Sequence, residues 1–149
     1  MPSDVRAADP KYILSVILEA MDHTDLRKLV DTLVEPLAPA PSRLVIDGAS
    51  VSLPSETVAS FALILCELSS NAIIHGAWSC DVGQVGIYWR PLPTQHLDFC
   101  WCERDGPAIT PPVWLGLGSS VIKVGLNGSD VDYQLKPEGL TCRIKLPLP

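Results

Sequence analysis

The chain has little positive charge and no cluster of it. Its 149 residues include 11 Lys and Arg against 17 Asp and Glu, which gives a formal net charge of -6. Proteins that bind the phosphate backbone of nucleic acids draw much of their affinity from concentrated positive charge. The sequence therefore predicts that nucleic acid is not a partner.

Long uninterrupted apolar runs are also absent. Charged residues or prolines interrupt each run before it reaches the roughly 18 to 20 residues that a membrane-spanning helix needs. The N-terminus has neither the basic start nor the small-residue cleavage pattern of a signal peptide. We therefore expect a cytoplasmic protein with no membrane span in this chain.

The cysteines do not form the even set that is typical of a disulfide framework. There are five, and most lie inside apolar runs, which favours reduced residues in a protein core. Cys100 and Cys102 are two apart in a strand-like run, so both side chains point to one face. Two ligands alone do not define a zinc site, and we interpret this pair as packing residues.

Length and apolar content suit one compact domain. Apolar residues from Tyr12 to Met21 and from Leu26 to Leu33 predict two short helices or one broken helix, with capping residues at Asp22 to Thr24 between them. We expect residues 1–25 to form a helical segment before a domain of residues 26–149.

A longer helix is predicted from Pro54 to about His75, where Gly76 ends it. Apolar residues recur along it at steps of three and four, whereas Glu67 and Asn71 lie four apart and project from another face. Taken alone, this pair is also what an ordinary solvated helix face contains.

The remaining segments predict a sheet. Arg43 to Asp47 is expected to form an edge strand, and a Gly/Pro-rich loop from Asp105 to Gly118 leads to a short helix from Ser119 to about Leu126. Hairpins combined with separate helices predict an α+β two-layer sandwich, a mixed sheet covered on one face by helices. The four hairpin strands are expected at Val82–Trp89, Leu97–Glu103, Val131–Leu135 and Leu140–Leu146, with connections at Arg90–His96 and Lys136–Gly139.

Three segments resemble, in their order and separation, the N, G1 and G2 boxes of the GHKL superfamily (gyrase, Hsp90, histidine kinase, MutL). They are Glu67-Leu-Ser-Ser-Asn71-Ala-Ile-Ile-His75-Gly76, Trp101-Cys-Glu103-Arg-Asp-Gly106-Pro107 and Gly116-Leu-Gly118-Ser119. The Trp-x-Glu of the second segment, the short Thr110-Pro-Pro112 lid and the closing Pro-Glu-Gly-Leu140-x-Cys142-x-Ile144 resemble more narrowly the HWE-type sensor histidine kinases. The resemblance runs from about Leu26 to Leu148.

The resemblance implies the Bergerat fold and a site for ATP and Mg²⁺. Asn71 is the candidate Mg²⁺ ligand, because Mg²⁺ prefers oxygen ligands, and Glu67 would polarise a water or position the attacking group. Glu103 would accept a hydrogen bond from the adenine amino group, and Gly106 would let the backbone approach the base. Trp101 could shape the pocket wall, but we interpret it as a core residue.

The third segment would bind the triphosphate. Gly116, Gly118 and Ser119 would offer backbone N–H groups at a helix start, which favours an anion. Lys123, about one helical turn onward, is the candidate phosphate-binding cation.

Several residues depart from the family pattern. Cys66 stands where the HWE pattern has a histidine, and Asp105 replaces the first glycine of Gly-Gly-Pro, which places a negative charge near the nucleotide. The arginines usual around the third segment are replaced by Trp114, Leu115 and Ser120. These departures predict weaker nucleotide binding, limited by recognition of the phosphates.

No His-x-x-x-Asn phospho-acceptor motif precedes Leu26, and His23 lacks the context of one. We therefore expect no self-phosphorylation, but transfer of the ATP γ-phosphoryl group to a histidine of a dimerisation domain or phosphotransfer protein, with a response regulator downstream. The alternative is a degenerate GHKL module that binds a partner without turnover, as an anti-sigma-like regulator or pseudokinase. The small size and short lid disfavour an ATPase of the gyrase or Hsp90 kind.

Overall fold

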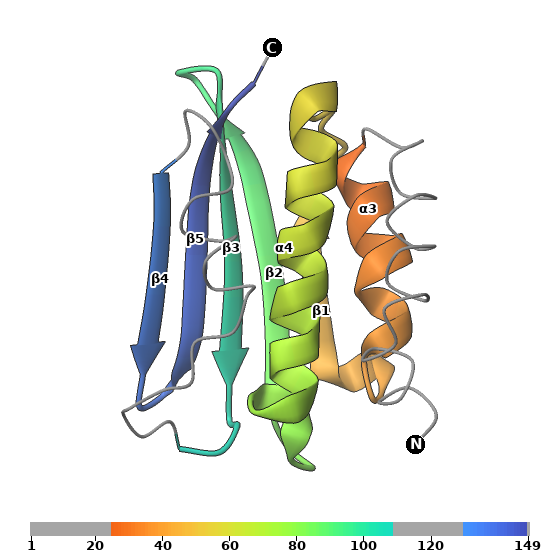
Figure 1. Cartoon of the computed structure of the whole chain (residues 1–149), viewed down its shortest axis with the longest axis vertical. Coiled ribbons are helices and arrows are strands. Elements are labelled where there is room, and N and C mark those ends of the chain that lie inside the picture. The colour runs from red at the N-terminus through yellow and green to blue at the C-terminus, as the bar shows by residue number, and fades with distance from the viewer. Residues whose placement is uncertain (1–24, 109–129, 149) are drawn as a thin grey trace.

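The computed structural model describes residues 25–108 and 130–148. It has two layers, a five-stranded sheet and, on one face of that sheet, the helices α3 (Leu26–Leu33) and α4 (Ser55–Ile74), which lie side by side (Figure 1). This is the predicted α+β two-layer sandwich. The long helix begins and ends within a residue of the bounds predicted for it.

The sheet is mixed, as predicted. Its strand order is β1-β2-β3-β5-β4, in which β1 runs parallel to β2 and the other neighbours are antiparallel. The edge position predicted for the first strand is confirmed. The strands are β1 (Leu44–Gly48), β2 (Gln84–Leu92), β3 (His96–Arg104), β4 (Asp130–Lys136) and β5 (Gly139–Pro147), and three short 3-10 helices are η1 (Glu35–Leu37), η2 (Pro41–Arg43) and η3 (Ala77–Ser79).

The first hairpin differs from the prediction in its turn. The sequence suggested a connection from Arg90 to His96, but β2 continues to Leu92 and β3 begins at His96, so that the turn contains only three residues. Two prolines in this stretch favoured the longer loop. β1 ends opposite Trp89, so Pro91 has a neighbouring strand on one side only, where proline is tolerated.

The N-cap of helix α3 is Asp25, one residue after the capping residues Asp22 to Thr24 expected from the sequence. The Asp25 carboxylate accepts a hydrogen bond from the backbone N–H of Lys28 at 3.2 Å and another from the Ser50 hydroxyl. These bonds stabilise the helix N-terminus and connect it to the segment after β1. The expected caps at Asp22 to Thr24, and all but the last residue of the helical segment expected over residues 1–25, lie outside the described residues.

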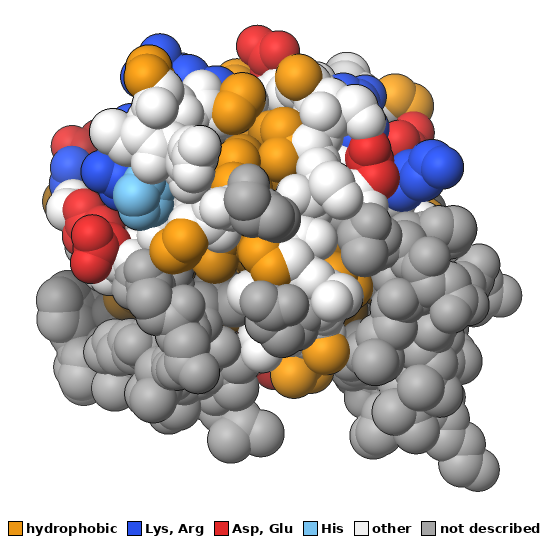
Figure 2. All heavy atoms as spheres, turned by 90° about the horizontal axis from the view of Figure 1, so that it is seen from above, with side chains coloured by type: hydrophobic (Ala, Val, Ile, Leu, Met, Phe, Trp, Pro, Cys, Tyr) orange, Lys and Arg blue, Asp and Glu red, His pale blue; other side chains and the backbone are white. Residues whose placement is uncertain are grey.

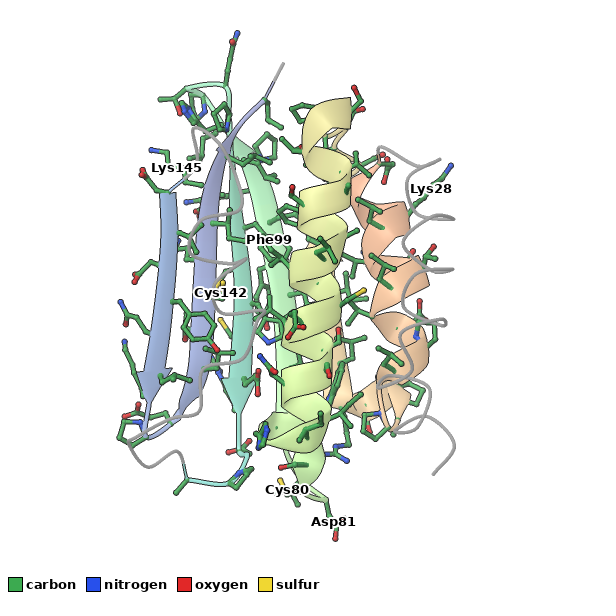
Figure 3. The ribbon with its side chains drawn as sticks, viewed as in Figure 1. Lys28, Cys80, Asp81, Phe99, Cys142 and Lys145 are labelled. Carbon is green, nitrogen blue, oxygen red and sulfur yellow. The ribbon has the colours of Figure 1, made fainter. Side chains whose placement is uncertain are left out.

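The hydrophobic core lies between the sheet and α4. Phe99 points from β3 toward α4 (Figure 3), where its ring meets that of Phe61 edge-on, with centroids 4.9 Å apart. Viewed from one end of the molecule, hydrophobic side chains gather in the middle and charged ones stand at the sides (Figure 2). The other fully buried hydrophobic side chains of α4 are Ala62, Ile64, Leu65, Leu68 and Ala72.

One segment, Thr57–Ser79, is long and apolar enough to cross a membrane by length and composition alone. Glu67 is the one charged residue of this segment, and because of it the sequence predicted an interrupted apolar run. Half of the most apolar stretch of this segment is buried inside the protein. A helix that is apolar nearly all round is also what a protein core requires, and the packing of α4 on the sheet accounts for its composition.

Candidate functional site

The end of α4, the 3-10 helix η3 and strand β3 meet at the carboxylate of Glu103. This side chain is buried on the inner face of β3, with 6% of its surface exposed. One oxygen, Oε1, accepts a hydrogen bond from the backbone N–H of Ala77 at 2.9 Å, and Oε2 accepts one from the indole N–H of Trp101 at 3.0 Å. The carboxylate is therefore oriented by two donors that are 26 and 2 residues away in sequence.

The two hydrogen bonds to Glu103 leave acceptor positions free on its carboxylate. An ionised carboxylate has about four acceptor positions, so each oxygen retains one for a further hydrogen bond. Burial raises the pKa of Glu103, while the bonds from Ala77 and Trp101 lower it. A further donor would help to compensate the loss of hydration that the buried carboxylate has undergone.

Two glycines allow close packing around Glu103: Gly76 lies against the Glu103 carboxylate, and Gly106 lies against the backbone of Ala77. A Cβ atom on Gly76 would lie 2.2 Å from Oε1 of Glu103, and one on Gly106 would lie 2.8 Å from the Cα atom of Ala77. Gly106 was expected to let the backbone approach the base, and in the structure it lies against Ala77. No side chain fits at either position without displacing its neighbour.

Asn71 lies one turn before the end of α4 and is buried, with 8% of its surface exposed. Its backbone oxygen accepts the N–H groups of His75 and Gly76, each at 2.9 Å, which ends the helix. Its side-chain Nδ2 is buried and has no hydrogen-bond partner within the described part of the chain. Buried amides are normally paired, so this donor is an exception among the described residues.

Glu67 lies one helical turn before Asn71 and is half buried. Burial raises the pKa of its carboxyl group. Both residues therefore belong to a partly enclosed face of α4, which disfavours the ordinary solvated face that was the alternative for this pair. Among residues 25–108 and 130–148, no three His, Cys, Asp or Glu side chains form a metal-binding group.

Asp105, which stands at a family glycine position, has a φ of 59°. Glycine adopts this left-handed region without steric cost, whereas other residues do so at a small cost that is lowest for Asn and Asp. We expect Asp105→Gly to raise the free energy of unfolding by about 0.5 to 1 kcal/mol, measured by urea denaturation. Gln95→Gly, at φ 58° in the β2–β3 turn, is the matched comparison and should give a larger gain, because Gln adopts this region at a higher cost than Asp. A loss of stability in Asp105→Gly would contradict this prediction.

Four of the predicted site residues lie in the described region. Glu103 and Gly106 meet at the C-terminal end of α4, the helix that also carries Glu67 and Asn71. The interpretation of Trp101 as a core residue is confirmed, since it is fully buried. The remaining residues, Gly116, Gly118, Ser119 and Lys123, together with Thr110–Pro112, Trp114, Leu115 and Ser120, lie outside the described residues, and their place in one cavity with Glu67, Asn71 and Glu103 stays a prediction.

Sequence reasoning missed part of the support for Glu103. Trp101 lies two residues earlier on the same strand face, a spacing that could have suggested its hydrogen bond. The second donor, the backbone N–H of Ala77, has no sequence signature. Gly76 was interpreted only as the residue that ends the helix, whereas it also makes room for the Glu103 carboxylate.

Comparison with known proteins gives matches among histidine kinases. The sequence matches no protein-family model. It is 32% identical over 131 residues to a blue-light-activated histidine kinase of Rhizobium johnstonii, and 31% identical over 113 residues to blue-light-activated histidine kinase 1 of Erythrobacter litoralis. These alignments cover 82% and 71% of this chain but only 36% and 31% of the relatives, so the chain spans about a third of their length.

The fold is shared with solved histidine kinase structures. The histidine kinase domain of the Erythrobacter litoralis EL346 blue-light-activated kinase superposes with a TM-score of 0.69 at 18% identity, covering 91% of this chain and 76% of that one. The mycobacterial sensor histidine kinase MprB gives 0.57 at 20% identity, covering 83% and 94%. Together with the sequence relatives, this common fold bears out the resemblance seen in the three boxes: the chain carries a catalytic domain of the HWE-type sensor histidine kinase family.

Proposed function

We propose that this domain binds ATP with Mg²⁺ and transfers the γ-phosphoryl group to a histidine on another domain or chain. The observation that carries the proposal is the Glu103 carboxylate, buried, oriented by Ala77 and Trp101, and still able to accept further hydrogen bonds. It lies at the end of the helix that carries Asn71. This arrangement suits recognition of a base at one position and of phosphates at another.

The adenine amino group is a suitable donor for Glu103. A buried acceptor that is already oriented discriminates strongly for a ligand with a donor, because a ligand without one leaves the carboxylate desolvated and incompletely paired. Trp101 and Ala77 hold the carboxylate in place before the ligand arrives, which lowers the entropic cost of binding. Gly76 and Gly106 let the Glu103 carboxylate and the Ala77 backbone pack closely at this position.

Asn71 and Glu67 would act at the phosphate end. The unpaired Nδ2 of Asn71 is a hydrogen-bond donor, which suits an oxygen of the nucleotide phosphates, whereas the amide oxygen of the same side chain is of the type that Mg²⁺ binds. When bound, Mg²⁺ neutralises phosphate charge and holds the triphosphate for transfer. Glu67, with its raised pKa, would accept a proton from, or orient, the attacking group. The acceptor histidine would belong to a dimerisation domain or phosphotransfer protein, with a response regulator downstream, in the cytoplasm.

Replacing the two key residues tests the proposal by calorimetry. We expect Glu103→Ala to weaken ATP and adenosine alike by about one to two decades, since both use the base anchor. Asn71→Ala should weaken ATP in the presence of Mg²⁺ by a similar factor and leave adenosine unchanged. Glu138→Ala, at the exposed β4–β5 turn, is the control and should bind both ligands normally. Unchanged ATP binding in both site variants would refute the proposal.

The second candidate is a module that binds a partner without turnover. It is favoured by the negative charge of Asp105, held beside Gly106 in a conformation that glycine adopts more readily. If this residue limits phosphate binding, Asp105→Gly combined with Ser120→Arg should tighten ATP more than adenosine. Absence of ATP binding in both the natural chain and this variant would favour the partner-binding alternative.

A further inference from the structure

Cys100 and Cys102 lie side by side on the face of the sheet opposite α3 and α4. Along β3, buried residues alternate with half-buried ones, and both cysteines belong to the half-buried set. The predicted common face is confirmed, and the two Sγ atoms are 3.1 Å apart. Both thiols are free, and no step of the proposed phosphotransfer uses them.

Small molecules can reach both sulfurs. Cys100 lines an open hollow of about 390 Å³ that also includes Tyr88, Asp98 and Arg143. Cys102 lines a smaller hollow of about 50 Å³. On the neighbouring strand, its cross-strand partner is Gly86, over which the side chain of Tyr88 lies.

The two thiols differ electrostatically. The hydrogen bond from Cys100 lowers the pKa of Cys102 to about 6, and the nearby positive charges of Arg104 and Arg143 act in the same direction. The same bond, together with burial, raises the pKa of Cys100. Asp98 also faces this pair, but it is paired with Arg143 at 2.8 Å. These effects favour the thiolate at Cys102 and the protonated thiol at Cys100.

The buried cysteines are in the opposite situation. Burial raises the pKa of Cys66 to about 11 and that of Cys142 to about 12. Thiols of this kind react slowly with oxidants, because the thiolate is the reactive form. The chain thus contains matched unreactive controls for the pair on the open face.

We propose that Cys100 and Cys102 form a redox modification site at which hydrogen peroxide converts the two thiols into a disulfide. The Cys102 thiolate sulfur attacks one peroxide oxygen, the O–O bond breaks, and the other oxygen leaves as hydroxide, which takes a proton from the solvent to become water, so that Cys102 becomes a sulfenic acid. The Cys100 sulfur then attacks the Cys102 sulfur, the S–O bond breaks, and the hydroxyl group leaves as a second water with the Cys100 proton. The two thiols lose two electrons, and one peroxide is reduced to two waters.

The spacing along the strand makes this disulfide feasible and easily reversed. Residues two apart in a strand have Cα atoms about 6.6 Å apart, near the upper limit of about 6.8 Å for disulfides. The strand must shorten slightly for the bond to form, and bonds formed away from the preferred spacing are reduced more readily. Trp101, between the two cysteines, donates to Glu103 from the other face, so the modification would occur directly behind that carboxylate.

The test is thiol counting and mass spectrometry on the full chain after mild peroxide treatment. The natural chain should go from five free thiols to three and lose two hydrogen atoms, with the bridge mapped to Cys100 and Cys102 and removed by a dithiol reductant. Cys100→Ser should stop at a sulfenic acid on residue 102, trapped by dimedone. Cys102→Ser should react at least about tenfold more slowly at neutral pH, as expected for loss of the thiolate.

Cys80→Ser is the control, because Cys80 is also partly exposed but lies beyond the end of α4 (Figure 3) and pairs with the backbone oxygens of Ala77 and Asp105 at 3.6 Å. The Cys80→Ser variant should form the same disulfide at the same rate as the natural chain. A bridge to any other cysteine, a disulfide only between two chains, or an unchanged rate in Cys102→Ser would each overturn the proposal. None of these readouts requires nucleotide, so they are independent of the proposed function.

Discussion

Gly76→Ala is expected to lower the free energy of unfolding by about 3 to 5 kcal/mol, because the new methyl group displaces the Glu103 carboxylate. Its Cβ would lie 2.2 Å from Oε1 of Glu103 and 3.0 Å from the Cα atom of Ala72. The backbone of α4 cannot withdraw, so the glutamate must. Ala77 and Trp101 would then lose the acceptor for their buried N–H groups. Urea denaturation, followed by circular dichroism, measures the loss.

A double-mutant cycle tests the cause of this loss. Glu103→Ala alone should also be destabilising, since it removes the same two hydrogen bonds. Gly76→Ala combined with Glu103→Ala should cost clearly less than the sum of the single changes, because the double variant has no carboxylate to displace. Strict additivity would mean that the methyl group clashes with the helix backbone rather than with Glu103. Weakened ATP binding in folded Gly76→Ala would further support Glu103 as the base anchor.

Phe99→Ala is expected to cost about 3 to 5 kcal/mol of unfolding free energy, as is usual for a large cavity in a core. Phe99 is fully buried, meets Phe61 at 4.9 Å and stacks on Trp89 at 6.4 Å. The side chain thus joins α4 to two strands. A fall in the urea midpoint, with an unchanged dependence on urea, would show a loss of stability without a change in the unfolding reaction.

Tyr88→Ala is the matched control for Phe99→Ala. Tyr88 is also aromatic and lies on the adjacent strand opposite Cys100, but it points to the open face and is 40% exposed. Its replacement should cost less than about 1 kcal/mol. Equal losses in the two variants would mean that the core does not lie on the α4 side of the sheet.

Local patterns were sufficient to predict the elements of this domain. The run of apolar residues at steps of three and four before Gly76 determined α4, and Pro137 and Gly139 bound the turn of the last hairpin. Alternation along β3 predicted that Cys100 and Cys102 share one face of the sheet. It placed Trp101 and Glu103 together on the other face. Such features depend on neighbours within a few residues, which a sequence displays directly.

The spacing of the three boxes also allowed Glu67, Asn71, Glu103 and Gly106 to be selected from the sequence alone. The likeness to histidine kinases in sequence and fold confirms the family and the fold, while the roles of these four residues stay predictions. Pattern reasoning failed where two effects compete locally. Pro91 and Pro93 suggested a long loop. Strand β2 nevertheless continues past Pro91, because that residue has a neighbouring strand on one side only.

The sequence by itself determined the order of helices and strands, the class of fold and the residues with suitable chemistry for a nucleotide site. Only the tertiary structure decided that the N–H of Ala77 would reach Glu103 across 26 residues, that Gly76 would lie against that carboxylate, and that an apolar helix would be a core helix. It also placed the two cysteine thiols on the open face of the sheet. These outcomes depend on how separate elements pack, and packing is set by the simultaneous burial of all of them, which no local pattern contains.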